Sequence, residues 1–161
     1  MLNNSSSTIH PILSRLIATH SETRRKPHHF NHLCCVFTSD GNVTRIGQND
    51  INEAYNGCMY GVHAEMNALF KLPPLNRQKT RIRLNIVVVR IDGQGRLKDS
   101  KPCAKCIKHM NRLPFATCYR IDRVYYSSKD GSIVKSNLST LNDDNNKYIT
   151  SGFRHARARN A

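Results

Sequence analysis

The sequence predicts an α/β domain in which helices pack on a mixed β-sheet. The length of 161 residues suits one domain with a core of its own. Helical and strand patterns follow one another in the order helix, hairpin, helix, strand, helix, strand, strand. The segment 84–91 (LNIVVVRI) is nearly continuous in Ile and Val, which is typical of a strand buried on both faces.

The first third of the chain predicts a helix and a β-hairpin. A helix is expected from Pro11 to about Thr23, since proline suits a helix start and four apolar residues fall on one helical face: Ile12, Leu13, Leu16 and Ile17. The segments 33–38 and 43–46 are apolar and β-prone, and the turn-forming residues 39–42 (SDGN) lie between them. The mixed polarity of residues 47–61 predicts a loop.

Two helices and three strands are expected in the rest of the chain. One helix spans His63–Leu72 and is ended by two prolines, and the other runs from Cys103 to about Leu113 after Pro102. The strand at 84–91 lies between these two helices. The strands 120–127 and 132–138 are joined by the tight turn Lys129–Gly131, so they should pair antiparallel. The polar segment 136–146 predicts a loop.

The charge of the chain is strongly positive. Lys and Arg number 25 against 11 acidic residues, for a formal net charge of +14. Such an excess favours polyanionic partners, among them nucleic acid and nucleotide phosphates, although a solvated basic surface is the simpler alternative. The same two alternatives apply to the basic residues around the second cysteine motif, namely Lys98, Lys101, Lys105, Lys108 and Arg112.

The composition favours an intracellular, cytoplasmic protein with reduced thiols. No stretch approaches the roughly 20 apolar residues of a membrane span, so no membrane partner is expected. Six cysteines occur without a recognisable secretory signal, which argues against a disulfide framework. Residues 1–26 are rich in Ser and contain three Arg, so organelle targeting remains the alternative to a first helix of the domain.

Three residues form a candidate zinc site: His63, Cys103 and Cys106. Zinc accepts imidazole nitrogen and thiolate sulfur. The two cysteines lie on one face of a first helical turn, where the positive end of the helix dipole favours thiolates. His109 would lie roughly 9 Å along the helix from Cys103, which is too far for the same ion. Three protein ligands leave one position for water, as in catalytic zinc sites.

Glu65 is the candidate general acid and base. It follows His63 by two residues, so it can reach a water on the metal, take its proton as zinc-bound hydroxide forms, and deliver protons to a substrate ring nitrogen and a departing amine. The segments His63-Ala64-Glu65 and Pro102-Cys103-Ala104-Lys105-Cys106 match the H-x-E…P-C-x-x-C pattern of zinc deaminases. The alternatives are a polynucleotide base-editing deaminase and a non-catalytic zinc-stabilised module that binds nucleic acid.

On these two motifs, the region from about Leu33 to Leu138 resembles the cytidine and deoxycytidylate deaminase superfamily. The resemblance implies a three-layer domain with a five-stranded mixed sheet and helices on both faces. It also implies hydrolytic removal of the exocyclic amine of a cytosine-type nucleoside or nucleotide (cytidine, deoxycytidine or dCMP), one Zn²⁺, and a homo-oligomer. Asn49 occupies a region that contacts the sugar in relatives, and Ala64 and Pro102 beside the ligands complete the candidate substrate-binding residues.

The resemblance also bears on the branch of the superfamily and on the division of the chain. An antiparallel last pair of strands resembles the cytidine and blasticidin deaminase branch, whereas nucleoside cytidine deaminases usually have Cys where this chain has His63. Possible substrates therefore include a small nucleoside or nucleotide and single-stranded nucleic acid. We expect an N-terminal helix and basic segment at 1–31, the deaminase zinc-binding domain at 32–140, and a flexible basic tail at 141–161.

Overall fold

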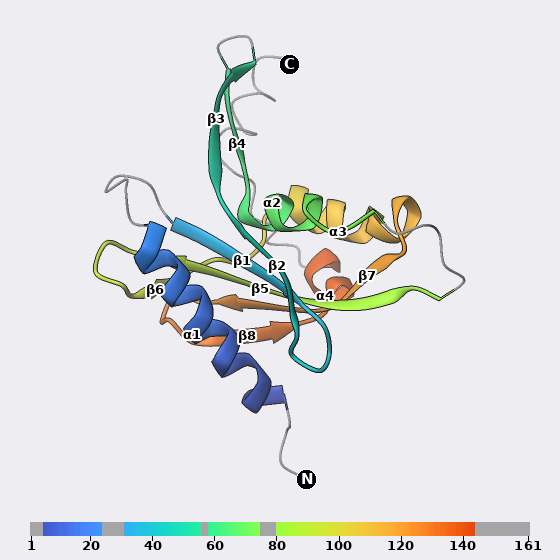
Figure 1. Ribbon diagram of the computed structural model, residues 1–161, viewed down its shortest axis with the longest axis horizontal. Coiled ribbons are helices and arrows are strands. Elements are labelled where there is room, and N and C mark those ends of the chain that lie inside the picture. Colours follow the sequence, from blue (N-terminus) through green and yellow to red (C-terminus); the bar gives the residue numbers. More distant parts are fainter. Residues whose placement is uncertain (1–4, 24–30, 56–57, 75–79, 144–161) are drawn as a thin grey trace.

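A mixed β-sheet with helices on both faces is the framework of the chain (Figure 1). The computed structural model describes residues 5–23, 31–55, 58–74 and 80–143. In these residues the five predicted strands are confirmed and follow the spatial order β2-β1-β5-β7-β8, and a short sixth strand pairs with β5. The strands are β1 (Asn31–Phe37), β2 (Val43–Gln48), β5 (Ile82–Ile91), β6 (Leu97–Lys98), β7 (Tyr119–Ser127) and β8 (Ile133–Ser136).

Strand directions follow from the connections. The tight turn at Gly41, which has a φ of 88°, makes β1 and β2 antiparallel. β5 pairs antiparallel with β1 and parallel with β7, because the helix α3 (Ala104–Ala116) crosses between β5 and β7. A second tight turn at Gly131 makes β7 and β8 antiparallel, as predicted.

Two hydrophobic layers hold the helices on the sheet. On one face, α1 (Ser5–Thr23) buries Ile12 and Leu16 against apolar residues of β1, β5 and β7. On the other face lie α2 (Ala64–Phe70), α3 and α4 (Leu138–Asp143). Alternation along β5 divides its side chains, with Ile86 and Val88 in one layer and Val87 and Val89 in the other. The predicted three-layer architecture is therefore confirmed.

The expected loop at 47–61 is wrong. β2 extends to Gln48, and β3 (Asp50–Tyr55) and β4 (Cys58–Val62) form an antiparallel hairpin. The hairpin stands out from the body of the molecule near the start of α2 (Figure 1). Backbone pairing across a hairpin does not require alternating hydrophobicity, so this sequence of mixed polarity carried no strand signal.

Two helices also differ from the prediction: α1 starts earlier than expected, and α4 lies in an expected loop. α1 begins at Ser5, so Pro11 lies inside the helix instead of at its start. A proline there removes one backbone hydrogen bond, which the helix accommodates while it packs on the sheet. The expected loop at 136–146 contains α4, whose first turn is capped by Asn137: its Oδ1 accepts from the backbone N–H of Thr140 at 2.8 Å.

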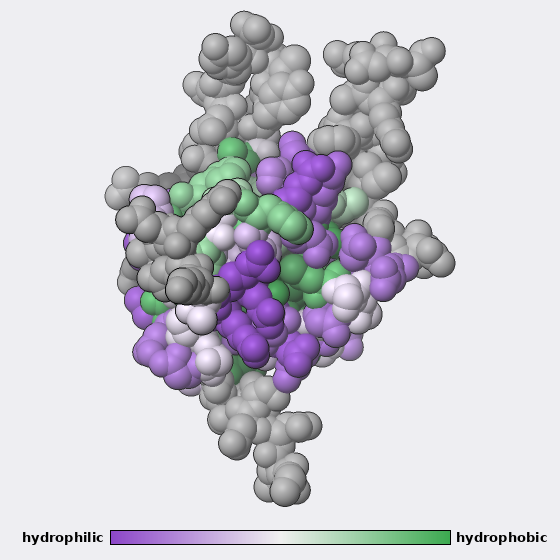
Figure 2. Space-filling view, turned by 90° about the vertical axis from the view of Figure 1, so that its right-hand side faces the viewer, coloured by the Kyte–Doolittle hydropathy of each residue, from purple (hydrophilic) through white to green (hydrophobic). Residues whose placement is uncertain are grey.

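The outer surface is largely hydrophilic at the end where β5 and β7 begin. Figure 2 looks onto this end, which is on the right in Figure 1, and shows hydrophilic residues gathered around a smaller hydrophobic area. In the described part of the chain, no helix combines the length and the apolar character needed to cross a membrane. The expected tail from residue 144 onward lies outside the described residues.

Candidate active site

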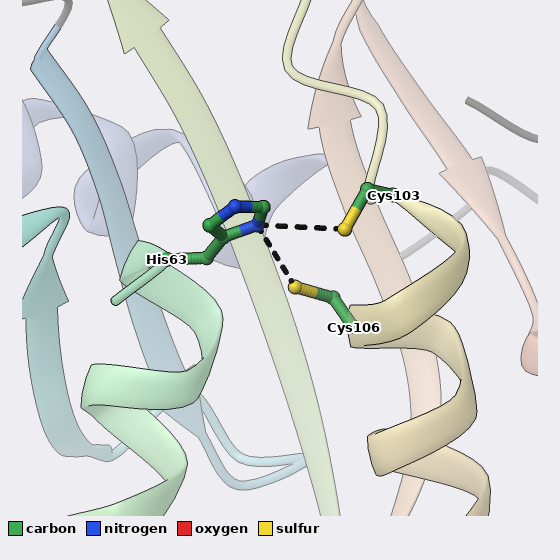
Figure 3. Close-up of side chains that lie close together, drawn as sticks. All are labelled: His63, Cys103 and Cys106. Atoms are coloured by element: carbon green, nitrogen blue, oxygen red, sulfur yellow. Dashed lines mark hydrogen bonds between the residues drawn. The ribbon is translucent and has the colours of Figure 1, made fainter. Parts of the chain in front are cut away.

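Three side chains that are distant in sequence converge between the starts of α2 and α3 (Figure 3). The Nδ1 atom of His63 lies 3.4 Å from the sulfur of Cys103 and 3.3 Å from the sulfur of Cys106. One donor atom from each residue lies within 4.8 Å of the other two. The structure therefore brings together the three residues that the sequence predicted as metal ligands.

Local helix geometry positions these donors. His63 and Cys103 are the N-cap residues of α2 and α3, both in extended conformation. Neither side chain caps its own helix, and both turn instead toward the shared site. Cys106 follows in the first turn of α3, three residues after Cys103, so both sulfurs lie on one side of that helix. Two positive helix ends thus meet at a site with two sulfur donors.

The two thiols and the imidazole share protons in this geometry. Hydrogen bonding from Cys106, and then from His63, lowers the pKa of Cys103. The same hydrogen bond, together with burial, raises the pKa of Cys106. Hydrogen bonding with Cys103 raises the pKa of His63. Cys103 is therefore favoured as a thiolate, whereas Cys106 and His63 would each release a proton when they bind a divalent cation.

The donor set fits zinc. Zn²⁺ prefers imidazole nitrogen and thiolate sulfur as ligands. Here the imidazole of His63 is partly buried and the two cysteines are buried. The cluster contains three His, Cys, Asp or Glu donors among the described residues, which is the ligand number of a catalytic zinc site. His109 does not join it, because its exposed ring instead makes an edge contact with Phe70, with ring centroids 6.5 Å apart. Cys34, Cys35 and Cys118 are buried in the core.

Glu65 lies beside the cluster and is almost completely buried, with 4% of its surface exposed. Burial raises the pKa of its carboxyl group, and its charge is close enough to Cys34 to help raise the pKa of that thiol. A carboxyl group with a raised pKa exchanges protons more readily near neutral pH. The environment of Glu65 is therefore suited to acid and base chemistry.

A buried pair of hydroxyl groups anchors the segment before Cys103, and no pattern in the sequence indicates it. Ser100 donates to the backbone oxygen of Val88 at 2.8 Å, and its own oxygen accepts from the backbone N–H of Ser127 at 2.9 Å. The hydroxyl of Ser127 lies 2.8 Å from that of Ser100 and donates to the backbone oxygen of Lys98. These bonds fix the chain that leads into Cys103 to the ends of β5 and β7.

Gly47 brings β2 into direct contact with α2. A Cβ atom at this buried glycine would lie 2.5 Å from the backbone oxygen of Ala64 and still closer to the backbone nitrogen of Ala68. No side chain fits there without movement of the helix that carries Glu65. A lone Gly in a strand pattern signals a close backbone approach, which is the sequence signal that could have revealed this contact.

Among the three candidate substrate-binding residues, Asn49 has a structural contact with β1. Its Oδ1 accepts from the backbone N–H of His32 at 2.9 Å, and its backbone N–H donates to the oxygen of His32 at 3.0 Å. Ala64 and Pro102 are buried next to the ligands. Substrate contacts by these residues remain a prediction.

His32 is a further residue near the cluster. It lies on β1 opposite Arg90 of β5, and its side chain is close enough to His63 and Asp99 for their charges to act on its pKa. Burial is the largest of these effects and lowers the pKa of His32 to about 4. A neutral imidazole therefore flanks the cluster at neutral pH.

Comparison with known protein families matches residues 7–127 to the cytidine and deoxycytidylate deaminase zinc-binding region. No curated protein matches the chain. Among solved structures, the chain is similar to cytidine deaminase from Burkholderia pseudomallei, with 24% identity and a TM-score of 0.51, over 81% of this chain and 96% of that one. This likeness shows a shared fold.

Two further structures are more distant. Cytidine deaminase from Mycobacterium leprae has 17% identity and a TM-score of 0.47, over 81% of this chain and 93% of that one. The apo dCMP deaminase from cyanophage S-TIM5 has 17% identity and a TM-score of 0.46, over 74% of this chain and 85% of that one.

Proposed function

The chain belongs to the cytidine and deoxycytidylate deaminase zinc-binding family, and from this premise we propose that it hydrolyses the exocyclic amine of cytosine in a free nucleoside or nucleotide. The observation that carries the proposal is the convergence of His63, Cys103 and Cys106, with Nδ1 of His63 within 3.4 Å of both sulfurs, beside the buried Glu65. The reaction converts cytosine and water to uracil and ammonia.

The three ligands would hold Zn²⁺, which when bound supplies a water of lowered pKa as the nucleophile. Glu65 would take a proton from the attacking water and pass it to N3 of the ring. It would then take the remaining proton from the new hydroxyl group at C4 and deliver it to the amine, which leaves as ammonia while the C4 carbonyl forms. The burial that raises the pKa of Glu65 suits a group that must both accept and release a proton.

A free nucleoside is favoured over a polynucleotide by the last two strands. β7 and β8 are antiparallel and joined by a tight turn, as in the cytidine and blasticidin deaminase branch that the chain resembles. By the same resemblance, the transfer-RNA adenosine, deoxycytidylate and polynucleotide-editing branches insert a helix at this point, so dCMP is less favoured than a nucleoside. Asn49, Ala64 and Pro102 remain the candidate substrate contacts within this proposal.

Ammonia release from metal-quantified protein tests the reaction. Candidate substrates are cytidine, deoxycytidine, CMP, dCMP and a cytosine-containing single strand. We expect turnover of a free nucleoside or nucleotide, and a loss of about 100- to 10,000-fold in Glu65→Gln with zinc retained. Asp143→Asn, at an exposed position on α4, is the matched control and should retain full activity.

The outcomes separate the three candidate functions. Turnover of the strand alone would favour a polynucleotide deaminase. The non-catalytic binding module would be favoured if the zinc-loaded protein released no ammonia from any substrate. In that case Glu65→Gln should also leave zinc content and stability unchanged.

We further propose that the enzyme is a homo-oligomer acting inside the cell. The assembly rests on the family resemblance, and the compartment on the need for reduced Cys103 and Cys106. Sedimentation velocity at micromolar concentration tests the assembly, and a purely monomeric boundary would contradict it.

A further inference from the structure

Among the described residues, α1 covers only part of one face of the sheet. α1 packs over the part of β5 that contains Val87, Val89 and Ile91. Arg83 lies on the same face, because its side chain alternates in phase with these residues, but it precedes them and is exposed. The start of β5 therefore presents a cation on a part of the sheet that α1 does not bury.

The register of the parallel strands places a second cation next to the first. Arg83 pairs directly with Arg120 of β7. Residues paired in neighbouring strands point to the same face, and neighbouring strands lie about 4.8 Å apart. Two guanidinium groups therefore project from adjacent positions.

A β-bulge adds a third cation. Leu84 pairs with Ile121, whereas the next residue, Asn85, pairs with Arg123, so Asp122 is an extra residue in β7. Without the bulge, residues three apart in a strand would point to opposite faces. With it, Arg123 joins Arg120 on the face that Tyr125 shares, and Arg123 is close enough to Tyr125 to oppose the rise in phenol pKa that burial causes.

Lys135 of β8 adds a fourth cation next to Arg83, Arg120 and Arg123. It pairs with Tyr125 and so lies on the same face, where it is exposed. Arg83, Arg120, Arg123 and Lys135 thus form a basic strip across three adjacent strands. Within it, Asp122 neutralises little charge, because its carboxylate lies 3.9 Å from Arg120 and both side chains are about 40% exposed (41% and 38%).

We propose that the basic strip binds the phosphate backbone of single-stranded nucleic acid. Three of its four residues are arginines, whose planar guanidinium groups suit phosphate oxygens. A flexible single strand can follow a row of cations across the sheet. Arg83 and Arg120 lie near the starts of β5 and β7, whereas the zinc cluster lies where α2 and α3 begin (Figure 1, Figure 3).

This surface is independent of the proposed reaction. Binding at the strip requires neither zinc nor Glu65. A protein that deaminates none of the substrates would therefore still bind nucleic acid at the strip. The four cations of the strip are part of the net charge of +14, and the proposal assigns them a nucleic-acid partner.

Fluorescence anisotropy with a fluorescein-labelled dT20 strand tests the proposal on the full chain. The wild type should bind with a strong salt dependence. Arg83→Glu/Arg123→Glu should weaken binding about tenfold or more at low salt and make the slope of log K against log salt shallower by about 1.4, since each lost phosphate contact on a single strand removes about 0.7. Deamination of a free substrate should be unchanged.

The matched control is Lys108→Glu/Lys129→Glu, which changes one exposed cation on α3 and one in the β7–β8 turn and lowers the net charge equally, from +14 to +10. It should bind dT20 nearly as well as the wild type. Equal weakening by both double variants would overturn the proposal, because net charge alone would then explain binding. An unchanged affinity in Arg83→Glu/Arg123→Glu, or no binding by the wild type, would also overturn it. Arg123→Gln/Lys135→Gln, a milder change at exposed positions, replaces the first variant if that one does not fold.

Discussion

The hydroxyl oxygens of Ser100 and Ser127 lie 2.8 Å apart although 27 residues separate them in the chain. Both residues are buried, with 3% and 0% of their surfaces exposed. Ser100 bridges the backbones of β5 and β7, and it precedes Cys103 by three residues. The pair therefore connects the centre of the sheet to the segment that carries the two cysteine ligands.

Ser100→Ala should lower the free energy of unfolding by about 1–3 kcal/mol, because it leaves the buried N–H of Ser127 without its partner. It should also weaken zinc binding, since the segment before Cys103 loses its anchor. Urea unfolding and zinc titration measure the two effects. Ser39→Ala, in the exposed β1–β2 turn, should stay within about 0.5 kcal/mol of the wild type. If Ser100→Ala has the same free energy of unfolding and the same zinc affinity as the wild type, the anchoring role is wrong.

Gly47→Ala should destabilise the protein by about 1–3 kcal/mol and reduce activity. The added methyl group would collide with backbone atoms of Ala64 and Ala68, so α2 must move and carry Glu65 with it. Gly93→Ala is the matched control, because nothing lies within 4 Å of a Cβ atom at that position. Thermal unfolding and steady-state kinetics compare the two. Similar behaviour of both variants would contradict the close contact between β2 and α2.

Cys106→Ser should leave the protein with little zinc after dialysis, because it removes one of only three proposed ligands. Cys118→Ser replaces another buried cysteine of the same core, outside the donor cluster, and should retain about one zinc per chain. Metal content by mass spectrometry distinguishes them. Chelation of the wild type should lower its melting temperature, and free zinc at 100 times its Kd should restore about 2.7 kcal/mol. Zinc retention by Cys106→Ser would reject this ligand assignment.

His32 should make the fold less stable as the pH falls from 6.5 toward 4. Burial, followed by the charges of Arg90 and His63, lowers the pKa of His32 to about 4, against a smaller opposing effect of Asp99. Between these pH values the unfolded chain binds a proton that the folded chain excludes. The free energy of unfolding therefore falls with pH, by up to about 3 kcal/mol from this group.

Urea unfolding at pH 7.5 and pH 4.5 measures the contribution of His32. Between these pH values, the free energy of unfolding should fall more in the wild type than in His32→Gln. The control His10→Gln, at an exposed position of α1, should lose as much stability as the wild type. Equal losses in the wild type and His32→Gln would show that His32 does not titrate in this way.

The sequence alone determined the fold class, the five main strands and the two helices that carry the proposed ligands. These features depend on local signals: the apolar run at 84–91, glycine turns at Gly41 and Gly131, and the short spacings around His63 and Cys103. Hydrophobic periodicity and ligand spacing are written in neighbouring residues, so they can be recognised without knowing what packs against them. The β3–β4 hairpin and α4 lacked such signals in the polar segments 47–61 and 136–146.

The contacts between distant segments, by contrast, follow from the packing of the folded chain. The Ser100–Ser127 pair, the approach of Gly47 to α2 and the lowered pKa of His32 each depend on which elements become neighbours. The basic strip depends on strand register as well, since one extra residue at Asp122 determines that Arg120 and Arg123 share a face. A register shift of one residue reverses the side of the sheet to which every following side chain points, and spacing along the chain does not reveal that shift.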